Sequence, residues 1–222
     1  MDWKNPYVSI DPLYIEAAWW TLKKAYDKGF LKEDVGVINW CPRCETAIAE
    51  SEVEYKDVSD PSIYVLFPIK KDDYTLDDMH DDTFILIWTT TPWTIPANVA
   101  IAVNPNLRYV EVLDKNNKRR IILAENCLSL LNSGGCTDYE ILRSFSGKDL
   151  EGLRYNHPLA DLVQKQRDFD HKVVLADFVT DENTGCVHIA PGHGEDDYSV
   201  GKKYGLPIFC PVNEEGVYTD DA

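Results

Sequence analysis

Basic side chains are scarce in this sequence. Its 222 residues include 22 Lys and Arg against 38 Asp and Glu, which gives a formal net charge of −16 at pH 7. Sequence-independent binding of nucleic acid needs clustered Lys and Arg that neutralise phosphates and release counterions. The composition therefore argues against such binding as the main function, and any contact with RNA must be local and directed by shape.

Long apolar runs are also missing. No run approaches the ~20 residues that span a bilayer, and the first four residues lack the basic and apolar regions of a secretory signal. The six cysteines are scattered apart from one pair, which does not suit the disulfide framework of a short secreted chain. At 44% hydrophobic residues, the chain can bury one sizeable core without disulfides. We expect a soluble cytoplasmic protein with reduced thiols and no membrane contact.

The sequence also lacks a second Cys-x-x-Cys pair. Cys41 and Cys44 have the spacing of half a zinc knuckle, but a tetrahedral structural zinc site needs two more ligands. The remaining cysteines are isolated in the sequence: Cys127, Cys136, Cys186 and Cys210. We therefore expect no metal site that is complete within this chain.

The first recognisable element is a helix. Asp11 and Pro12 are typical of an N-cap followed by the first helical residue, and Gly29 is typical of the left-handed residue after a helix. Apolar residues between them recur at helical spacing. The pattern predicts an amphipathic helix whose apolar face packs on a neighbour.

From residue 35 onward the pattern is mainly β. Short runs rich in β-branched and aromatic residues are separated by Pro, Gly, Asn and Asp. The predicted strands are residues 62–69, 83–90, 99–103, 109–113, 120–123, 172–179 and 185–190. Their number and spacing predict a closed or nearly closed barrel with peripheral helices, and a sandwich is the alternative. The acidic stretch at residues 71–82 is expected to be a solvated loop.

Hydroxyl side chains gather at one predicted strand end, in residues 88–98, which we call the threonine segment. Pro92 cannot donate to a β-ladder, so the preceding threonines fall where the strand leaves the sheet. Together with Asn98 they would form a neutral polar pocket suited to an ester, a ribose or a water molecule. Threonine also favours β-edges for structural reasons alone.

A second polar stretch, residues 184–198, is called the histidine segment. Strand alternation puts Cys186 and His188 on one face, away from the more apolar one. A turn at residues 191–194 leads into a helix expected to begin near residue 195, which places Asp196 and Asp197 in its first turn. The helix dipole favours ionised carboxylates there, so we predict a lowered pKa for Asp197.

Two other functions fit some of these residues. A cysteine or serine hydrolase could use Cys186 with His188 or His193, although no third activating group or oxyanion-forming elbow is evident. An RNA-binding module could use the half zinc knuckle and the few basic clusters, with no catalysis of its own. The acidity and the missing second Cys-x-x-Cys count against the latter.

Together, the threonine and histidine segments resemble the two signature stretches of the editing (CP1) domain of isoleucyl-tRNA synthetases, and residues 39–55 resemble the entry into that domain. The resemblance covers almost the whole chain. Related valyl and leucyl enzymes typically carry an arginine soon after the threonines, where this chain reads Thr-Pro-Trp-Thr-Ile-Pro-Ala-Asn. That difference favours the isoleucyl branch, and the Pro-Gly-His-Gly turn favours its bacterial-like subgroup.

The resemblance implies a mainly β fold with peripheral helices, built on a closed β-barrel of the editing-domain type. It implies that residues 1–45 are the edge of a parent catalytic domain and the entry into the insertion, and that residues 46–222 are a C-terminally truncated editing domain. The ATP-binding HIGH and KMSKS signatures are absent, so this fragment should not charge tRNA. The parent would use ATP and Mg, and in many members Zn, for which Cys41 and Cys44 are half of the site.

The activity implied by the resemblance is hydrolysis, without a cofactor in this fragment, of the ester in tRNA(Ile) wrongly charged with valine. Partners would be the valine-bearing 3′ end of tRNA(Ile) and the parent's catalytic domain, with the chain a monomer. The implied catalytic residues are Thr89, Thr90, Thr91 and Asp197, the last holding the substrate α-ammonium. The implied substrate-binding residues are Thr94, Asn98, His188 and Asp197, with His188 against the amino-acid side chain.

Overall fold

The computed structural model describes residues 6–70 and 82–222. It divides into two compact units, residues 1–36 and 37–222, which are described separately. The sequence predicted that residues 1–45 belong to the edge of a parent catalytic domain and the entry into the insertion, and that residues 46–222 are the editing domain. This division differs from the boundary between the two compact units, and it stays a prediction. Nearly all of the acidic stretch expected to be a solvated loop lies outside the described residues.

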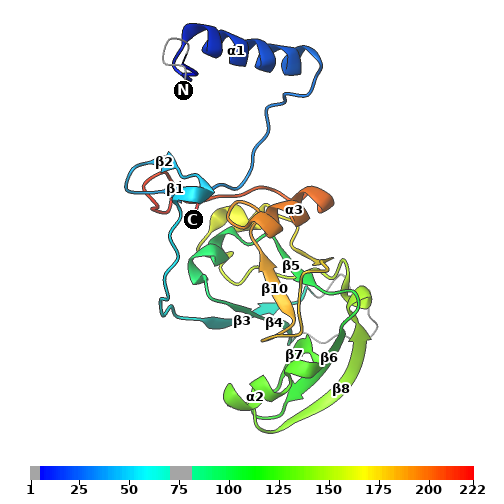
Figure 1. Ribbon diagram of the computed structural model, residues 1–222. Helices are drawn as coiled ribbons and strands as arrows, with labels where there is room; N and C mark the ends of the chain where they lie inside the picture. The colour runs from blue at the N-terminus through cyan, green and yellow to red at the C-terminus, as the bar shows by residue number, and fades with distance from the viewer. Residues whose placement is uncertain (1–5, 71–81) are drawn as a thin grey trace. The chain divides into compact units, whose positions relative to one another are not determined.

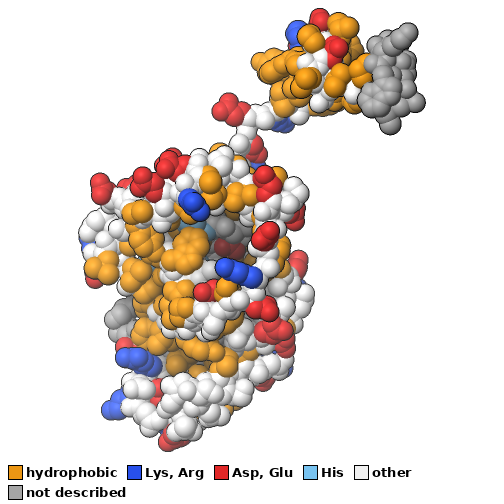
Figure 2. All heavy atoms as spheres, turned by 60° about the vertical axis from the view of Figure 1, so that its left-hand side comes forward, with side chains coloured by type: hydrophobic (Ala, Val, Ile, Leu, Met, Phe, Trp, Pro, Cys, Tyr) orange, Lys and Arg blue, Asp and Glu red, His pale blue; other side chains and the backbone are white. Residues whose placement is uncertain are grey.

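The smaller unit contains one helix, α1 (Pro12–Asp27). Asp11 is its N-cap, and the side chain accepts a hydrogen bond from the Leu13 backbone N–H at 2.8 Å. Gly29 follows the helix at φ 71°, a conformation that glycine adopts at little cost. The predicted helix is therefore confirmed. Within this unit no residue of α1 is buried, and apolar side chains cover much of its visible face (Figure 2).

A five-stranded sheet forms one part of the larger unit (Figure 1). Its spatial order is β3 (Ile63–Pro68), β4 (Thr83–Thr89), β7 (Arg119–Ala124), β6 (Arg108–Asp114) and β8 (Tyr139–Ser146). β4 and β7 pair in parallel, and the other neighbours pair antiparallel. Because β3 and β8 each have one partner in this sheet, both are edges.

A three-stranded sheet has the order β10 (Cys186–Ile189), β5 (Ala100–Val103) and β9 (Lys172–Leu175). β5 pairs antiparallel with β10 and in parallel with β9, and all four of its residues are buried. A smaller apolar cluster joins this sheet to α3 (Glu195–Tyr204), with Ala100, Ala102, Ile189 and Val200 among its members. Small alanine side chains on the central strand leave room for the helix.

Short elements complete the larger unit. A hairpin of β1 (Trp40–Cys41) and β2 (Thr46–Ala47) precedes β3, and the Trp40 indole N–H donates to the Glu214 carbonyl at 2.8 Å. The remaining helices are α2 (Ser129–Ser133) and the 3-10 turns η1 (Glu50–Glu52), η2 (Pro92–Ala97), η3 (Glu125–Cys127), η4 (Gly147–Leu150) and η5 (Gln164–Arg167).

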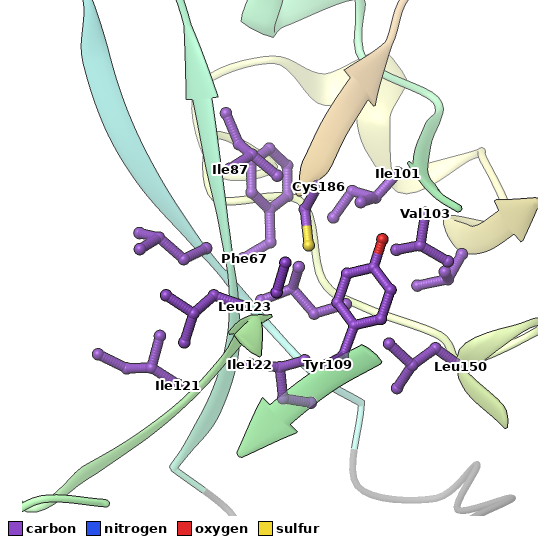
Figure 3. Packing of buried hydrophobic residues seen from close by; sticks show 14 of the residues in the cluster. Phe67, Ile87, Ile101, Val103, Tyr109, Ile121, Ile122, Leu123, Leu150 and Cys186 are labelled. Atoms are coloured by element: carbon purple, nitrogen blue, oxygen red, sulfur yellow. The ribbon is translucent and has the colours of Figure 1, made fainter. Parts of the chain in front are cut away.

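The main core lies beside the five-stranded sheet and includes the buried ring of Tyr109 (Figure 3). Its hydroxyl donates to the Gly185 carbonyl at 2.7 Å and accepts from the Asn104 backbone N–H at 2.9 Å. Gly185 has φ 67°, and a Cβ there would lie 2.4 Å from the Ala124 Cβ. This close approach anchors the chain just before β10 against the end of β7.

The closed barrel predicted from the sequence is wrong, whereas the mainly β character with peripheral helices is confirmed. A barrel requires each strand to pair on both sides. Among the described residues, the two larger sheets are open, and only isolated bridges, Ile69 to Tyr155 and Arg154 to Lys172, lead from the edge of β3 toward β9. Two single bridges through a short segment do not make a continuous ladder, so the sheets keep their edges.

Candidate functional site

The threonine segment begins where β4 ends. Thr89 is the last residue of β4, and its hydroxyl accepts a hydrogen bond from the Thr91 backbone N–H at 3.1 Å. The two hydroxyls, Thr89 Oγ1 and Thr91 Oγ1, are 3.2 Å apart. This local bond replaces the ladder bond lost at the strand end, and Pro92 then opens η2. The hydroxyls therefore crowd the strand end, as their spacing predicted.

The hydroxyls continue as a chain to His188. Thr94 Oγ1 lies 3.3 Å from Thr91 Oγ1 and donates to the Thr91 carbonyl at 2.8 Å. His188 Nε2 lies 3.0 Å from Thr94 Oγ1. Because the single Thr94 proton is used on the carbonyl, Nε2 must carry the proton that it donates to Thr94. The other imidazole nitrogen, Nδ1, is then an acceptor, and it is buried with no partner among the described residues.

His188 lies on β10, opposite Ile101 of β5, and only 7% of its surface is exposed. Burial lowers the pKa of its imidazole to about 4, and the nearby His193 adds to the effect. Both disfavour the protonated ring. His188 is therefore neutral near pH 7, and it is a weak base there because its pKa lies far below the operating pH.

Asp197 lies in the first turn of α3, as predicted. Its Oδ2 accepts a hydrogen bond from the Ala190 backbone N–H at 2.9 Å, so the carboxylate folds back onto the turn at residues 191–194. A Cβ on Gly194 would lie 2.8 Å from the Asp197 Cγ. Glycine is thus required there for the carboxylate to reach the end of β10, two residues beyond His188.

The predicted lowering of the Asp197 pKa is wrong. Burial raises the pKa of this carboxyl group to about 6, although the Ala190 hydrogen bond opposes the rise and the nearby Asp196 adds to it. The helix N-terminus favours the carboxylate form by a smaller amount than the loss of hydration costs. The sequence placed the residue on its helix but did not indicate how deeply the carboxyl group is covered.

Asn98 is fully buried and faces away from solvent. Its Nδ2 donates to the Ala100 carbonyl at 2.8 Å, and its Oδ1 accepts from the Tyr155 hydroxyl at 2.6 Å. Because both groups of the amide have protein partners, the geometry favours a supporting role for Asn98 within the threonine segment over direct contact with a substrate. Thr90, in contrast, is exposed.

An aromatic pair flanks the site. The exposed ring of Trp93 meets the imidazole of His193 edge to face, with ring centroids 5.2 Å apart. His193 Nε2 is buried without a partner in the described part of the chain, and burial lowers its pKa. Trp93 was not predicted as a site residue, although an exposed tryptophan between Pro92 and Thr94 is itself a signal.

Comparison with known proteins decides the family. Residues 1–202 match the model for tRNA synthetases class I (I, L, M and V). The chain belongs to this family. An isoleucine–tRNA ligase of Methanothrix thermoacetophila is 54% identical over 226 residues, and one of Archaeoglobus fulgidus is 51% identical over 225 residues. Each match covers 100% of this synthetase chain and 21% of the relative, so the chain spans about a fifth of their length.

Solved structures agree with the synthetase assignment at the level of fold. The crystal structure of GlLeuRS-CP1 aligns with a TM-score of 0.50 at 19% identity, over 67% of this chain and 66% of that chain. The P. knowlesi cytosolic leucyl-tRNA synthetase editing domain also aligns with a TM-score of 0.50 at 19% identity, over 64% and 62%. Both likenesses support the editing-domain fold.

In this synthetase chain, Cys186 is a core residue. It is 2% exposed, and Figure 3 shows its sulfur pointing toward the Tyr109 ring among apolar side chains. Burial raises the pKa of the thiol well above its ordinary value. A nucleophilic cysteine needs an accessible thiolate. The geometry therefore disfavours the cysteine-hydrolase alternative.

Cys41 is the last residue of β1, and Cys44 lies in the turn of the β1–β2 hairpin. Hydrogen bonds from the backbone N–H groups of Cys44 and Arg43 lower the pKa of the Cys41 thiol. The side-chain hydrogen bond between the two free thiols raises the pKa of Cys44. The described residues contain no group of three or more His, Cys, Asp or Glu placed to hold a metal ion. The hairpin thus supplies two thiols, which fit half of a tetrahedral zinc set.

Charge on the larger unit follows the composition. In Figure 2, acidic side chains are spread over its visible face and basic ones are few. None of the helices that the structure describes combines the length and apolar character needed to cross a bilayer. The cytoplasmic location and the monomeric state stay predictions.

Proposed function

We propose that this chain hydrolyses the ester that joins valine to the 3′ end of tRNA(Ile), as the editing part of an isoleucyl-tRNA synthetase. The observation that carries the proposal is the continuous chain of hydrogen bonds from Thr89 through Thr91 and Thr94 to His188. Similarity to isoleucine–tRNA ligases over all of this chain, which is 21% of the relative's length, and the editing-domain fold support it. Valine differs from isoleucine by one methylene, and a binding pocket can use that group for only about 1–3 kcal/mol of discrimination. Isoleucyl-tRNA synthetase is itself the standard example of this limit.

In the proposed reaction, water adds to the ester carbonyl carbon. The bond from that carbon to the ribose oxygen then breaks, and a proton from water ends on the ribose hydroxyl, releasing valine and tRNA. Threonine hydroxyls can both donate and accept, so Thr89, Thr90 and Thr91 would orient the ribose and the attacking water. Thr94 would hold His188 in place through the bond to its Nε2.

His188 and Asp197 would recognise the amino acid. A neutral imidazole held by Thr94 is suited to be a fixed wall beside the side chain, and its low pKa makes it a poor general base. Asp197 is mainly ionised above about pH 6 and would bind the α-ammonium. A bound cation favours the charged carboxylate, so substrate binding should lower that pKa.

The proposal is tested with the purified chain and two substrates, Val-tRNA(Ile) and Ile-tRNA(Ile), by measuring free amino acid against time. We expect valine to be released well above the spontaneous rate and isoleucine at about that rate. Background release from both substrates would overturn the proposal. Tight binding of tRNA without hydrolysis would instead favour the RNA-binding alternative.

Two additions to this assay test the chemistry. Dialysis against a strong chelator should leave hydrolysis intact, because the candidate site offers hydroxyls, an amide, an imidazole and a carboxylate. Loss of activity with a persistent fold, restored by zinc, would contradict metal-free hydrolysis. Cys186→Ala should also retain activity, since the thiol is buried in the main apolar core. Loss of activity in a folded variant would revive covalent cysteine catalysis.

A further inference from the structure

Three buried side chains from one distant stretch of sequence each bind the threonine segment. His157 Nε2 lies 3.0 Å from the Ile95 carbonyl oxygen. Gln166 Nε2 donates to the Pro96 carbonyl at 2.5 Å. The Tyr155 hydroxyl donates to Asn98 Oδ1 at 2.6 Å. We call Tyr155, His157 and Gln166 the clamp.

The orientation of the His157 ring follows from its two partners. Its Nδ1 accepts from the Leu159 backbone N–H at 3.1 Å, so Nε2 carries the proton and donates to the Ile95 carbonyl. Burial lowers the pKa of His157 to about 4, which keeps this neutral form near pH 7. The ring therefore acts as a fixed donor.

His171 contacts all three residues of the clamp. Its Nε2 lies 2.9 Å from the Gln166 carbonyl oxygen, and its ring centroid is 5.2 Å from that of Tyr155 and 5.4 Å from that of His157. Tyr155 and Gln166 are 0% and 1% exposed. Side chains packed this closely have little freedom to change rotamer.

The threonine segment needs such support because of its prolines. Pro92 and Pro96 carry no N–H, so neither residue can donate a backbone hydrogen bond within η2. A buried carbonyl left without a donor is costly. The Ile95 carbonyl accepts from the Asn98 backbone N–H at 3.0 Å and gains a second donor in His157, while Gln166 supplies a donor to the Pro96 carbonyl. These carbonyls come directly after Thr94, whose hydroxyl binds His188. Fixing residues 95–98 thus fixes the last threonine of the hydrogen-bonded chain.

We propose that the clamp positions the catalytic threonines: Tyr155, His157 and Gln166 hold residues 95–98 so that Thr91 and Thr94 keep their hydrogen bonds to each other and to His188. These residues touch no substrate and act through the threonine segment. The inference rests on the proposed function, and it names positioning residues that lie some sixty residues away in the sequence.

The test compares two buried tyrosines. Tyr155→Phe removes only the hydroxyl that binds Asn98, and Tyr109→Phe removes a hydroxyl of equal burial whose partners are Gly185 and Asn104. In both folded variants, Val-tRNA(Ile) hydrolysis is measured below the melting temperature. We expect Tyr155→Phe to lower kcat by about 10- to 100-fold with little change in KM, as displacement of catalytic groups does, and Tyr109→Phe to leave kcat nearly unchanged. Equal effects of the two substitutions on kcat would overturn the clamp.

A second pair of variants guards against loss of folding. His157→Leu removes the donor to the Ile95 carbonyl, whereas His157→Gln keeps an N–H donor at about the same distance from Cβ as the imidazole Nε2. Recovery of most of the lost kcat in His157→Gln relative to His157→Leu is expected. Identical kcat in the two variants would contradict a role for the donated hydrogen bond.

A readout independent of hydrolysis separates this inference from the proposed function. The imidazole nitrogen signals of His188 in NMR spectra report its bond to Thr94. Tyr155→Phe should shift them, and Tyr109→Phe should not. If wild type shows no hydrolysis but Tyr155→Phe still shifts these signals, the proposed function fails, while the clamp is still shown to position Thr94 and His188. If wild type is active and Tyr155→Phe leaves the signals unchanged, the clamp alone is refuted.

Discussion

At the scale of single residues, Asp197 shows how burial and charge compete. The carboxylate stands at a helix N-terminus, which favours its charged form, yet burial raises its pKa to about 6. A covered carboxylate that remains mostly ionised near neutral pH is a good partner for a cation. Its interaction with an ammonium group is strong because little water screens it.

Asp197→Asn keeps the size of the side chain and removes its charge, so we expect strongly impaired hydrolysis of Val-tRNA(Ile). A lost charge-assisted contact in a desolvated site typically costs about 2–5 kcal/mol. Asp196→Asn, on an exposed neighbour, should have a milder effect. N-acetyl-Val-tRNA(Ile) carries no ammonium, so wild type should cleave it poorly and Asp197→Asn should add little further loss. Equal damage to both substrates, with fast cleavage of the acetylated one by wild type, would point to direct catalysis instead.

His188 belongs to the same scale because a single ring defines one wall of the proposed pocket. His188→Ala should relax selectivity by allowing the additional methylene of isoleucine, whose exclusion is worth about 1–3 kcal/mol. The measurement is hydrolysis of Ile-tRNA(Ile) by the variant. Loss of valine hydrolysis with no gain on isoleucine would assign His188 a water-positioning role.

At the scale of elements, the turn at residues 191–194 decides where Asp197 lies. Gly192 faces the Phe209 carbonyl, where a Cβ would come within 2.4 Å of the oxygen. This neighbour is backbone, so relief requires the turn or the chain at Phe209 to move. The turn connects the end of β10 to α3, and its position sets the distance between His188 and Asp197.

Gly192→Ala is therefore expected to destabilise the fold by about 1–3 kcal/mol, as overpacking does, and to impair Val-tRNA(Ile) hydrolysis. Gly134→Ala is the matched control, because its nearest atoms would be 3.6 and 3.7 Å away and its φ is negative. Urea unfolding and the hydrolysis assay check both variants. A Gly192→Ala protein as stable and active as wild type would show that the turn yields easily.

At the scale of the whole molecule, four imidazoles of the described residues have lowered pKa values, and three of them are buried while that of His193 is partly buried. Those of His157 and His188 fall to about 4 from 6.5, chiefly through burial, and those of His171 and His193 are lowered as well. The unfolded chain therefore binds more protons than the folded one between about pH 6.5 and 4, so acid removes stability in this window. Asp197 acts in the opposite sense, because its folded pKa is raised from 3.8 to about 6.

We expect the free energy of unfolding of wild type to fall as the pH is lowered from 7 to 4.5. In His157→Gln the fall should be smaller by about 2 kcal/mol, because glutamine binds no proton in this range. Urea titrations at the two pH values measure this difference. Tyr109→Phe is the control, because its side chain does not titrate in the window and its loss of stability should be the same at both pH values. Parallel losses in wild type and His157→Gln would contradict the buried neutral form of His157.

Much of the local structure could be predicted from the sequence. The helix after Asp11, the helix at Glu195 and seven of the strands follow from caps, periodicity and turn residues, which act over a few positions. β8 was missed because it is an edge strand with most of its residues partly or fully exposed, so it lacks a clear apolar alternation. Residues 35–39, where the mainly β pattern was predicted to begin, form no strand.

The residues of the candidate site could also be predicted from the sequence, because its hydroxyls, His188 and Asp197 lie in two short segments with recognisable patterns. Only the tertiary structure decided that the sheets stay open, that burial raises the pKa of Asp197, and that Asn98 is covered. It alone brought Tyr155, His157 and Gln166 to the threonine segment. The physical reason is range: a cap or turn depends on neighbours in the chain, whereas strand pairing, desolvation and buried hydrogen bonds depend on residues that only folding brings together.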